Sequence, residues 1–571
     1  MENIFLNKVK KRRKEGTIIS LIYYLCKQNN NYMKKEFKIG FKNFKKFQDF
    51  PMIELAPITL LVGPNNSGKS SFIKAFTFLF SNLDSQPKSK VILPPFIKQV
   101  SFHQDTIAHF EWGDFSTTLN KGQEAHEISF CWELEGTFYN FNFGASKEDI
   151  SDNPSLLATL PINSFTVKNS KLGIVIENHS LDNDRWSTIF KIDPKILQEW
   201  LKESIMNLEN DIQKRKHFAV FVSSKSSSWE IMSNEAEIQL NEYKQAENIL
   251  SEQDINDYIL LELKDNRLGE TEMQLNKKIQ EAKSLTNFLE SEKDHNPVNV
   301  PHIYIDDESI HKATGPVKAE ILKDYCNHCV NCISGNRNSL EKSTIFPDFT
   351  YIETHNAPHS LAINKEDKNS FIAQTIADFY SKVPRFKDSS VYPFVVKWMD
   401  KFHIGTDFEI NTHFGGEVYT VDIVKEDETM PLGTLGTGAI QIFILLLKLA
   451  TILKTIGEDA NIVILVEEPE QNLHPELQSK LAELFLEVYE KSGHRIHFVI
   501  ETHSEYLIRK TQVMVADEKY AGVKKDAPFK VYYFPEKRLP YDMGYLPNGC
   551  FSEKFETGFF DEASNLAFEI F

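Results

Sequence analysis

The feature that most constrains this chain is a glycine-rich loop at residues 63–70, which reads Gly-Pro-Asn-Asn-Ser-Gly-Lys-Ser. An apolar run at residues 58–62 precedes the loop, and residues 71–76 open a helical pattern after it. This order predicts a strand, a loop and a helix whose first backbone N–H groups converge on one point. Converging N–H groups at a helix N-terminus bind phosphate, and the helix dipole favours its negative charge. An ordinary Gly/Ser-rich turn is the alternative, and the complete pattern in this context disfavours it.

The side chains of the loop indicate which phosphate compound it binds. Lys69 would reach the β- and γ-phosphates of a nucleotide, and the Ser70 hydroxyl would bind Mg²⁺. We therefore expect ATP with Mg²⁺ as the ligand. The residues expected to contact it are Gly63, Pro64, Asn65, Asn66, Ser67, Gly68, Lys69, Ser70 and Ser71.

A second motif, at residues 462–470, is an apolar run that ends in acids: Ile-Val-Ile-Leu-Val-Glu-Glu-Pro-Glu. A continuous apolar run of this length is typical of a central parallel strand covered on both faces. Open α/β sheets bind their ligands at the carboxyl ends of such strands. Glu467 would hold Mg²⁺, and Glu468 would polarise the attacking water. The alternative, a buried strand with a solvated acidic end, is weakened by the Asn-Leu-His-Pro sequence that follows at residues 472–475.

The pattern Glu-Glu-Pro-Glu-x-x-Leu-His-Pro resembles the Walker B motif and D-loop of ABC-type ATPases of the RecF, SMC and OLD group. In ABC-type heads the first acid is usually Asp, and Glu467 is similar to the variant of the OLD-like branch. A third apolar run, residues 499–504, ends in Glu-Thr-His-Ser, where His503 resembles the switch histidine that contacts the γ-phosphate. A lone histidine at a strand end is more often structural, but this spacing and neighbourhood favour the switch role.

The fourth motif, at residues 435–441, reads Leu-Gly-Thr-Gly-Ala-Ile-Gln and precedes an apolar helix at residues 442–453. It resembles the signature loop that binds the γ-phosphate held by an opposite subunit. Thr437 would replace the usual serine hydroxyl, and Gly436 and Gly438 would let backbone N–H groups approach the phosphate. A glycine turn before a core helix is the alternative. Gln99 and Gln104 are candidates for the Q-loop glutamine of such proteins, and the sequence singles out neither.

The resemblance implies an α/β fold, namely an ABC-type P-loop ATPase head of two lobes, with a mostly parallel core sheet, an antiparallel β subdomain and a helical insertion. Alternating aromatic and β-branched residues between 128 and 192 predict the antiparallel sheet. Heptads in the Glu/Lys/Leu-rich region after residue 194 are not sustained, so a long coiled-coil arm is not expected. We expect an appended segment or start-site artefact at 1–32, lobe I with Walker A at 33–193, the helical insertion at 194–345, lobe II with signature, Walker B and switch at 346–528, and a C-terminal tail subdomain at 529–571.

Net charge, hydropathy and cysteine content limit the kinds of partner and compartment that we expect for this chain. The net charge of −17 provides no general attraction to nucleic acid or to an anionic membrane, and no run of 18 apolar residues predicts a membrane span. Six cysteines are too few for a disulfide scaffold and indicate a reducing cytoplasm. Cys326, His328, Cys329 and Cys332 form half of a zinc pattern without a second half, so incidental buried thiols are the favoured alternative.

The resemblance implies an ATPase that closes as a head-to-tail dimer in DNA transactions or anti-phage defence, with a separate nuclease or toxin effector. The remainder after His503 contains no Asp-x-Asp pair, so the Toprim nuclease domain of OLD proteins is not expected. The alternative is a nucleotide-gated sensor or assembly module with negligible turnover that controls a partner protein. The long insertion and the Glu-Glu-Pro-Glu variant disfavour a transporter subunit.

Overall fold

The computed structural model describes most of the chain after its N-terminal segment. The described residues are 37–84, 99–102, 113–120, 126–134, 136–181, 186–221, 227–252, 257–263, 310–334, 348–352, 363–364, 367, 370–426, 428–457, 460–517, 528–557 and 559–561. The predicted appended segment 1–32 and the candidate Gln104 lie outside them.

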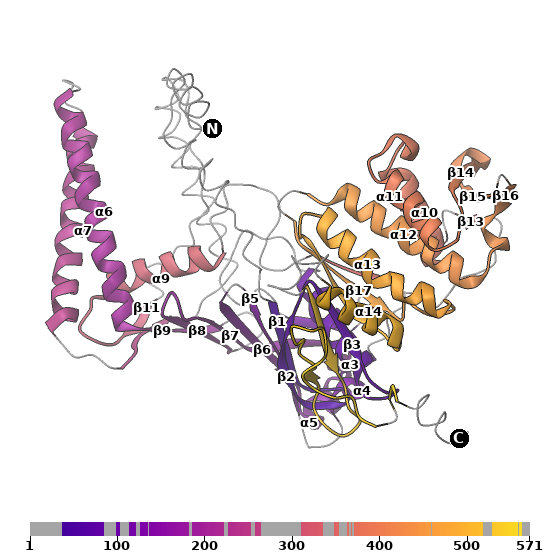
Figure 1. Cartoon of the computed structure of the whole chain (residues 1–571). Helices are drawn as coiled ribbons and strands as arrows, with labels where there is room; N and C mark the ends of the chain where they lie inside the picture. Colours follow the sequence, from indigo (N-terminus) through magenta and orange to yellow (C-terminus); the bar gives the residue numbers. More distant parts are fainter. Residues whose placement is uncertain are drawn as a thin grey trace.

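A six-stranded sheet forms the centre of the described molecule (Figure 1). Its strand order is β12 (Asp348–Ile352), β17 (Ile462–Glu467), β18 (Ile496–Glu501), β3 (Ile58–Val62), β19 (Phe529–Tyr533) and β20 (Tyr541–Asp542). Every neighbouring pair from β12 to β19 is parallel, and only β19 and β20 pair antiparallel. The carboxyl ends of β17, β18 and β3 therefore meet at one edge, where parallel sheets bind their ligands.

The parallel sheet is buried on both faces, which explains why its strands are apolar throughout. Val463 and Leu465 of β17 face the hydrophobic core that contains α3 (Lys69–Asp84). Ile464 and Val466 face the opposite core, which contains α12 (Thr437–Thr455), α13 (Pro475–Lys491) and α14 (Glu505–Ala516). Side chains that alternate along a strand thus serve two cores.

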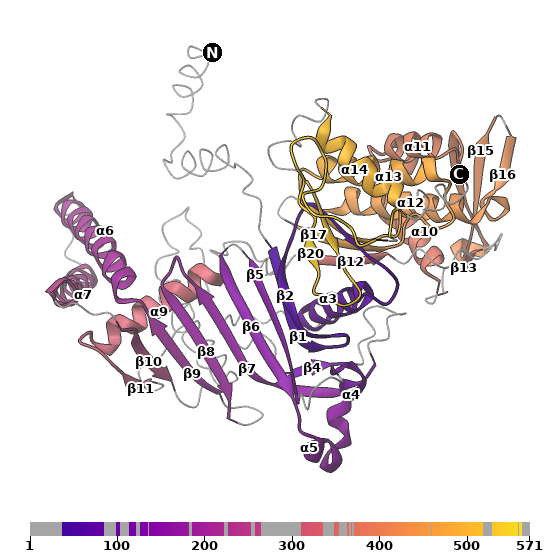
Figure 2. The ribbon, with the colours of Figure 1, turned by 60° about the horizontal axis from the view of Figure 1, so that its bottom comes forward.

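A larger antiparallel sheet lies on the α3 side (Figure 2). Its order is β11 (Ile310–Ala313), β10 (Ile259–Leu263), β9 (Trp186–Ile192), β8 (Ile174–Ser180), β7 (Thr159–Asn169), β6 (Thr137–Gly144), β5 (Glu127–Leu134), β1 (Phe37–Phe44) and β2 (Phe47–Leu55), with β4 (Gln99–Ser101) paired to β7. Short helices α4 (Phe115–Thr118), α5 (Lys147–Asp152) and η1 (Pro154–Leu157) lie between its strands in the chain. Phenylalanine rings such as Phe41 and Phe72, 6.4 Å apart, join this sheet to α3.

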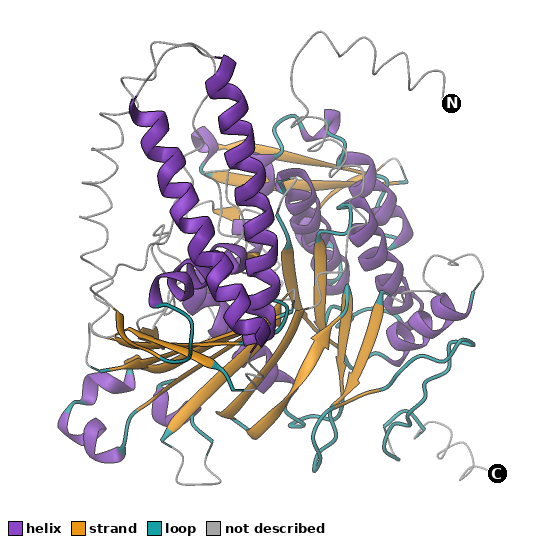
Figure 3. Cartoon of the chain, turned by 90° about the vertical axis from the view of Figure 1, so that its left-hand side faces the viewer, coloured by secondary structure: helices purple, strands orange, loops and turns teal. Residues whose placement is uncertain are grey.

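The segment predicted as a helical insertion contains strands as well as helices. Helices α6 (Pro194–Phe221) and α7 (Ser227–Glu252) run side by side away from the sheet (Figure 3), joined by ion pairs such as Lys244–Glu209 at 2.5 Å. After α7 the chain returns as β10 and β11 to the edge of the antiparallel sheet, and α9 (Ala319–Ser334) packs there. The predicted insertion at 194–345 is therefore not purely helical, because β10 and β11 extend the antiparallel sheet that begins before residue 194. Pairing between distant strands is not encoded in local periodicity.

The second lobe contains a helical layer and a small sheet. Its elements are α10 (Phe371–Lys382), η2 (Phe386–Asp388), α11 (Tyr392–Lys401), β13 (Ile363–Asn364), β14 (Asp407–His413), η3 (Phe414–Gly416), β15 (Val418–Lys425), β16 (Glu428–Pro431) and η4 (Leu432–Thr434). The predicted hairpin around Gly415 and Gly416 is the β14–β15 pair. Helix α12 is long and apolar enough to cross a membrane by length and composition, yet 72% of its apolar window is buried inside the protein. It is the core helix of this lobe.

The predicted α/β head, with a mostly parallel core sheet and an antiparallel β subdomain, is confirmed by these two sheets. Residues 529–533, which we assigned to the C-terminal tail, instead form β19 beside β3 in the parallel sheet. An apolar strand of five residues shows its type in the sequence but not its neighbour, which explains the difference.

Candidate functional site

The loop at residues 63–70 connects β3 to α3, as predicted. Gly63 has φ +155°, and a Cβ there would lie 2.3 Å from the carbonyl oxygen of Phe534. Gly68 has φ +111°, and a Cβ there would lie 2.4 Å from the ring of Phe47. Both positions favour glycine, because the backbone has positive φ and the space for a Cβ is taken by Phe534, directly after β19, and by Phe47 of β2.

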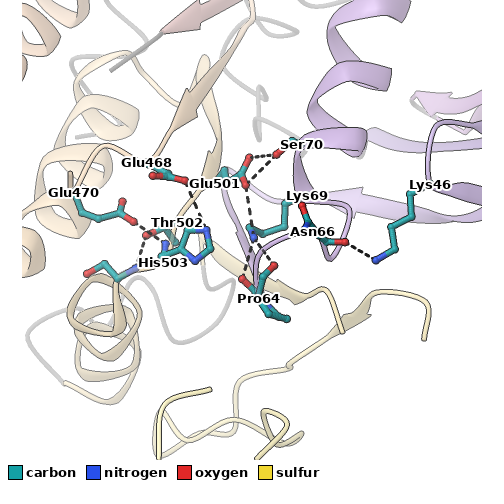
Figure 4. A network of polar contacts seen from close by, with 12 residues as sticks. Lys46, Pro64, Asn66, Lys69, Ser70, Glu468, Glu470, Glu501, Thr502 and His503 are labelled. Atoms are coloured by element: carbon teal, nitrogen blue, oxygen red, sulfur yellow. Dashed lines mark hydrogen bonds and ion pairs between the residues drawn. The ribbon is translucent and has the colours of Figure 1, made fainter. Parts of the chain in front are cut away.

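Lys69 lies at the start of α3 and is only 3% exposed. Its Nζ donates to the carbonyl oxygens of Gly63 at 2.9 Å and Pro64 at 3.0 Å, so the side chain curls over its own loop. Burial lowers the pKa of Lys69, and the nearby carboxylate of Glu501 opposes that shift. The ammonium is thus held at the concave side of the loop (Figure 4).

Glu501 ends β18 and faces the same loop from the neighbouring strand. Its Oε1 lies 3.7 Å from Lys69 Nζ, and both carboxylate oxygens lie 3.4 Å from Ser70 Oγ. In the strand register Glu501 stands opposite Glu467 of β17. Burial raises the pKa of the Glu501 carboxyl to about 7, and Lys69 opposes the shift.

Glu468 and His503 form the second polar pair of the site. His503 Nε2 lies 3.7 Å from Glu468 Oε1, and both side chains are partly exposed. Glu468 has a left-handed backbone (φ +43°), and its Oε2 accepts a hydrogen bond from the Gln471 amide. Burial and Lys69 lower the pKa of His503, while Glu468 raises it. The lowered pKa favours the neutral imidazole, in which one ring nitrogen is a donor and the other an acceptor.

Glu470 fixes the backbone of the switch segment. Its side chain is buried, and its Oε1 accepts the backbone N–H of His503 at 2.6 Å. Burial raises the pKa of Glu470, and this hydrogen bond opposes the shift. The Walker B segment and the switch segment are consequently joined by a direct contact.

Glu468, Glu470 and His503 line an open cavity of about 450 Å³ at the carboxyl edge of the parallel sheet. Its lining residues are Asn65, Glu468, Glu470, Gln471, Asn472, Gln478, His503 and Ser504. Ser504 Oγ accepts the backbone N–H of Leu507 at 3.1 Å and so caps α14, which begins immediately after the switch residues. The structure therefore brings the phosphate loop, the acids that follow β17 and His503 together at one edge of the sheet.

The predicted signature residues lie apart from Lys69. Gly436, Thr437 and Gly438 line a second cavity of about 270 Å³ at the N-terminus of α12, where Gly436 is the N-cap. A Cβ on Gly438 would lie 2.3 Å from the carbonyl oxygen of Asn472, so this turn packs against the D-loop. Asn472 lines both cavities, and its amide donates to Gln441 of α12 at 3.2 Å.

The donor set of the site suits a hard divalent cation. Carboxylate oxygens of Glu468 and Glu501 and a ring nitrogen of His503 all lie within 4.8 Å of one another. Ser70 adds a hydroxyl next to Glu501. Magnesium prefers oxygen ligands from one or two carboxylates plus substrate phosphates. Of the two predicted ligands, Ser70 lies beside Glu501 of this group, and Glu467 stands opposite Glu501 in the strand register. Their role as Mg²⁺ ligands stays a prediction.

Two other predictions concern residues outside this cluster. Cys326 and Cys329 are buried in α9 and burial raises the pKa of both thiols, while Cys332 Sγ lies 3.6 Å from His328 Nε2 on the exposed side. Among the described residues, only the Glu468, Glu501 and His503 group gathers three side chains around one metal position. Gln99 is exposed at the start of β4, and its role as Q-loop glutamine stays a prediction.

Glu501 and Glu470 are site residues for which the sequence motifs suggested no role. A signal for Glu501 exists: like Glu467, it is the last residue of an apolar strand, two positions after a side chain of the α3 core. Side chains two apart on a strand share a face, so both acids point toward α3. Recognising this requires knowing that β18 lies between β17 and β3.

Comparison with known proteins adds a family. The AAA ATPase domain model matches residues 33–508. No curated protein matches the chain significantly.

Solved structures with similarity include an Smc head domain with an extended coiled coil bound to the C-terminal domain of ScpA, from Pyrococcus furiosus. It is 10% identical, with a TM-score of 0.29, over 94% of this chain and 99% of that chain. An Smc head domain with a coiled coil and joint from Pyrococcus yayanosii is 12% identical, with a TM-score of 0.29, over 87% of this chain and 94% of that chain. The family match spans most of the chain and every motif from the phosphate loop to the switch histidine, and the chain therefore belongs to the AAA ATPase domain family.

Proposed function

We propose that this chain binds ATP and hydrolyses it to ADP and phosphate. The observation that carries the proposal is the convergence of Lys69, Ser70, Glu468, Glu501 and His503 at the carboxyl edge of one parallel sheet (Figure 4). Each of these groups has a known use in phosphoryl transfer: a cation for phosphates, a hydroxyl for a metal and a carboxylate for water.

Some residues of the site would bind the nucleotide, and others would act on the attacking water and the γ-phosphate. Lys69 offers its ammonium to the terminal phosphates, and the N–H groups at the start of α3 surround them. Glu468 accepts a proton from water, since its carboxylate borders the open cavity. His503, held by its backbone bond to Glu470, donates a hydrogen bond to the γ-phosphate from its neutral ring.

Ser70 and Glu467 would hold Mg²⁺ in this site, with Glu501 alongside. The bound ion would neutralise charge that develops on the transferred phosphoryl group.

We propose that two heads close head-to-tail over two nucleotides. The arrangement of the second cavity supports this: Gly436 is exposed, Thr437 is half-buried, and the N-terminus of α12 has no side-chain cap. A helix N-terminus with free N–H groups favours an anion. A partner's γ-phosphate, arriving at a surface away from Lys69, would be that anion.

The motifs are similar to those of the OLD-like branch, and we place the protein in the cytoplasm, in DNA transactions or anti-phage defence with a separate nuclease or toxin effector. The second candidate is a nucleotide-gated module with negligible turnover. It is favoured by the engagement of Glu468: the Gln471 amide bonds one carboxylate oxygen, and His503 lies near the other.

Phosphate release by the purified full chain tests the proposal, with and without DNA. The wild type is expected to release phosphate, and Lys69→Ala is expected to bind ATP at least about 100-fold more weakly, because the mutation removes the ammonium that faces the terminal phosphates. Thermal unfolding of both proteins checks that the fold is retained. Equal ATP affinity in the two proteins contradicts the phosphate-loop assignment, whereas tight binding without phosphate release supports the gated module.

A further inference from the structure

Glu501 contacts both side chains with which the phosphate loop would hold a nucleotide. Its carboxylate lies 3.7 Å from Lys69 Nζ and 3.4 Å from Ser70 Oγ, and the residue is only 5% exposed. The carboxylate therefore occupies the place where terminal phosphates have to be accommodated beside the loop.

The backbone of Glu501 is held in position. Strand β18 is hydrogen-bonded to β17 on one side and to β3 on the other, with Glu501 opposite Glu467 and Leu61. The carbonyl oxygen of Glu501 also accepts the N–H of Glu468 at 2.8 Å. The Cα of Glu501 therefore cannot move away from an incoming nucleotide without breaking the central sheet, and only rotation of the side chain can shift the carboxylate.

The negative charge of Glu501 then determines whether nucleotide binds more tightly with a divalent cation or without one. A carboxylate and a phosphate charge about 5 Å apart repel each other enough to weaken binding by about 100-fold at an effective dielectric constant near 20. Glu467 and Glu468 stand next to Glu501 and add charge of the same sign. A divalent cation between carboxylate and phosphate reverses the sign of this interaction.

We propose that Glu501 makes ATP binding by this chain dependent on a divalent cation. Glu501 would hold the cation together with Ser70 and Glu467, and it would repel nucleotide that arrives without one. A carboxylate and a hydroxyl select a hard ion such as Mg²⁺ or Mn²⁺. This inference rests on the proposed function, and it assigns to Glu501 a role that the motifs assign only to Ser70 and Glu467.

The test measures ATP affinity, not turnover. A fluorescent ATP analogue is titrated into the full chain in MgCl₂ and in EDTA at equal ionic strength and at about pH 8.5, where the Glu501 carboxyl is ionised. The proteins compared are the wild type, Glu501→Gln and the control Glu505→Gln. Glu505 is the matched control because it allows the same Glu→Gln substitution outside the site. It lies on α14, where its carboxylate pairs with Arg509. We expect Mg²⁺ to raise the affinity of wild type and Glu505→Gln by at least about 100-fold, and that of Glu501→Gln by less than about tenfold, chiefly because its affinity in EDTA rises.

The outcomes separate the inference from the proposed function. An equal Mg²⁺ effect in Glu501→Gln and wild type overturns the role of Glu501. Equal affinity of the wild type in MgCl₂ and EDTA also overturns it, and this measurement needs no variant if Glu501→Gln fails to fold. A wild type that binds no ATP even in MgCl₂ contradicts the proposed function itself.

Discussion

Buried charges at the site are balanced by specific neighbours. Lys69 and Glu501 share a contact at 3.7 Å in a nearly dry place, where an unpaired charge would cost several kcal/mol. Motif spacing predicted Lys69, since the phosphate loop is a local pattern. It could not predict Glu501, because Ser70 and Glu501 are 431 positions apart and meet only through the strand order.

His497 of β18 provides a test of pH-dependent stability. Burial lowers its pKa to about 4, and the ring of Tyr489 lies 5.9 Å away. In the unfolded chain His497 binds a proton near pH 6.5, whereas in the folded chain it stays neutral down to about pH 4. Protonation therefore favours the unfolded chain, so the folded chain keeps its full stability above pH 6.5 and loses part of it as pH falls toward 4. We expect the wild type to lose about 2–3 kcal/mol of unfolding free energy over this range through His497.

Urea unfolding at several pH values measures this effect. His497→Gln should show a flatter fall of unfolding free energy between pH 6.5 and 4, whereas His413→Gln, at an exposed end of β14, should keep the wild-type slope. An identical slope in wild type and His497→Gln would show that His497 is protonated without cost in the folded chain.

Among the elements, the first turns of α12 meet Asn472 between the two cavities. The apolar pattern of residues 442–453 predicted the helix, and the structure extends it to Thr437–Thr455. The contact of its first turn with Asn472 was not predictable, since Asn472 has a left-handed backbone (φ +57°) that periodicity does not encode.

The glycines at this junction differ in their surroundings. A Cβ on Gly438 would lie 2.3 Å from the backbone oxygen of Asn472, while a Cβ on Gly436 would meet nothing within 4 Å. We expect Gly438→Ala to lower the unfolding free energy by about 1–3 kcal/mol, because backbone must move to admit the methyl group. Gly436→Ala is the matched control and should lower it by only about 0.5 kcal/mol, because alanine is a poorer N-cap than glycine but its methyl group meets nothing. Urea titration gives both values, and equal destabilisation would show that the junction relaxes freely.

At the scale of the whole molecule, the site lies at the carboxyl edge of the central sheet, and a second cavity lies at the N-terminus of α12, with Asn472 lining both. The proposed closure of two chains would use both cavities, one from each chain.

Glu468→Gln should separate closure from chemistry. The amide keeps the shape of the side chain but does not accept a proton, so ATP is bound and not cleaved. Light scattering with ATP is expected to show a dimer or larger assembly of Glu468→Gln that persists longer than in wild type. If Glu467→Gln traps that species and Glu468→Gln does not, the roles of the two acids are reversed.

We also expect no nuclease activity in the purified full chain. Two-metal cleavage of a phosphodiester needs several carboxylates around ions about 4 Å apart, and within the part of the chain that the structure describes the single such cluster belongs to the proposed ATP site. Plasmid, linear duplex, single-stranded DNA and RNA should all remain intact with Mg²⁺ or Mn²⁺ and ATP. Cleavage that persists in Lys69→Ala and disappears on mutation of another acidic cluster would reveal a second site.

The sequence by itself determined the chemistry of this protein: a phosphate loop, an acid-ended strand, a switch histidine and a glycine turn, each a local pattern of residue types within one strand, loop or helix. Only the tertiary structure decided which strands are neighbours and which side chains are in contact. It placed β18 between β17 and β3, which brings Glu501 to Lys69, and it returned β10 and β11 to the antiparallel sheet. The physical reason is that strand order and the direction of each side chain depend on burial between segments far apart in the chain.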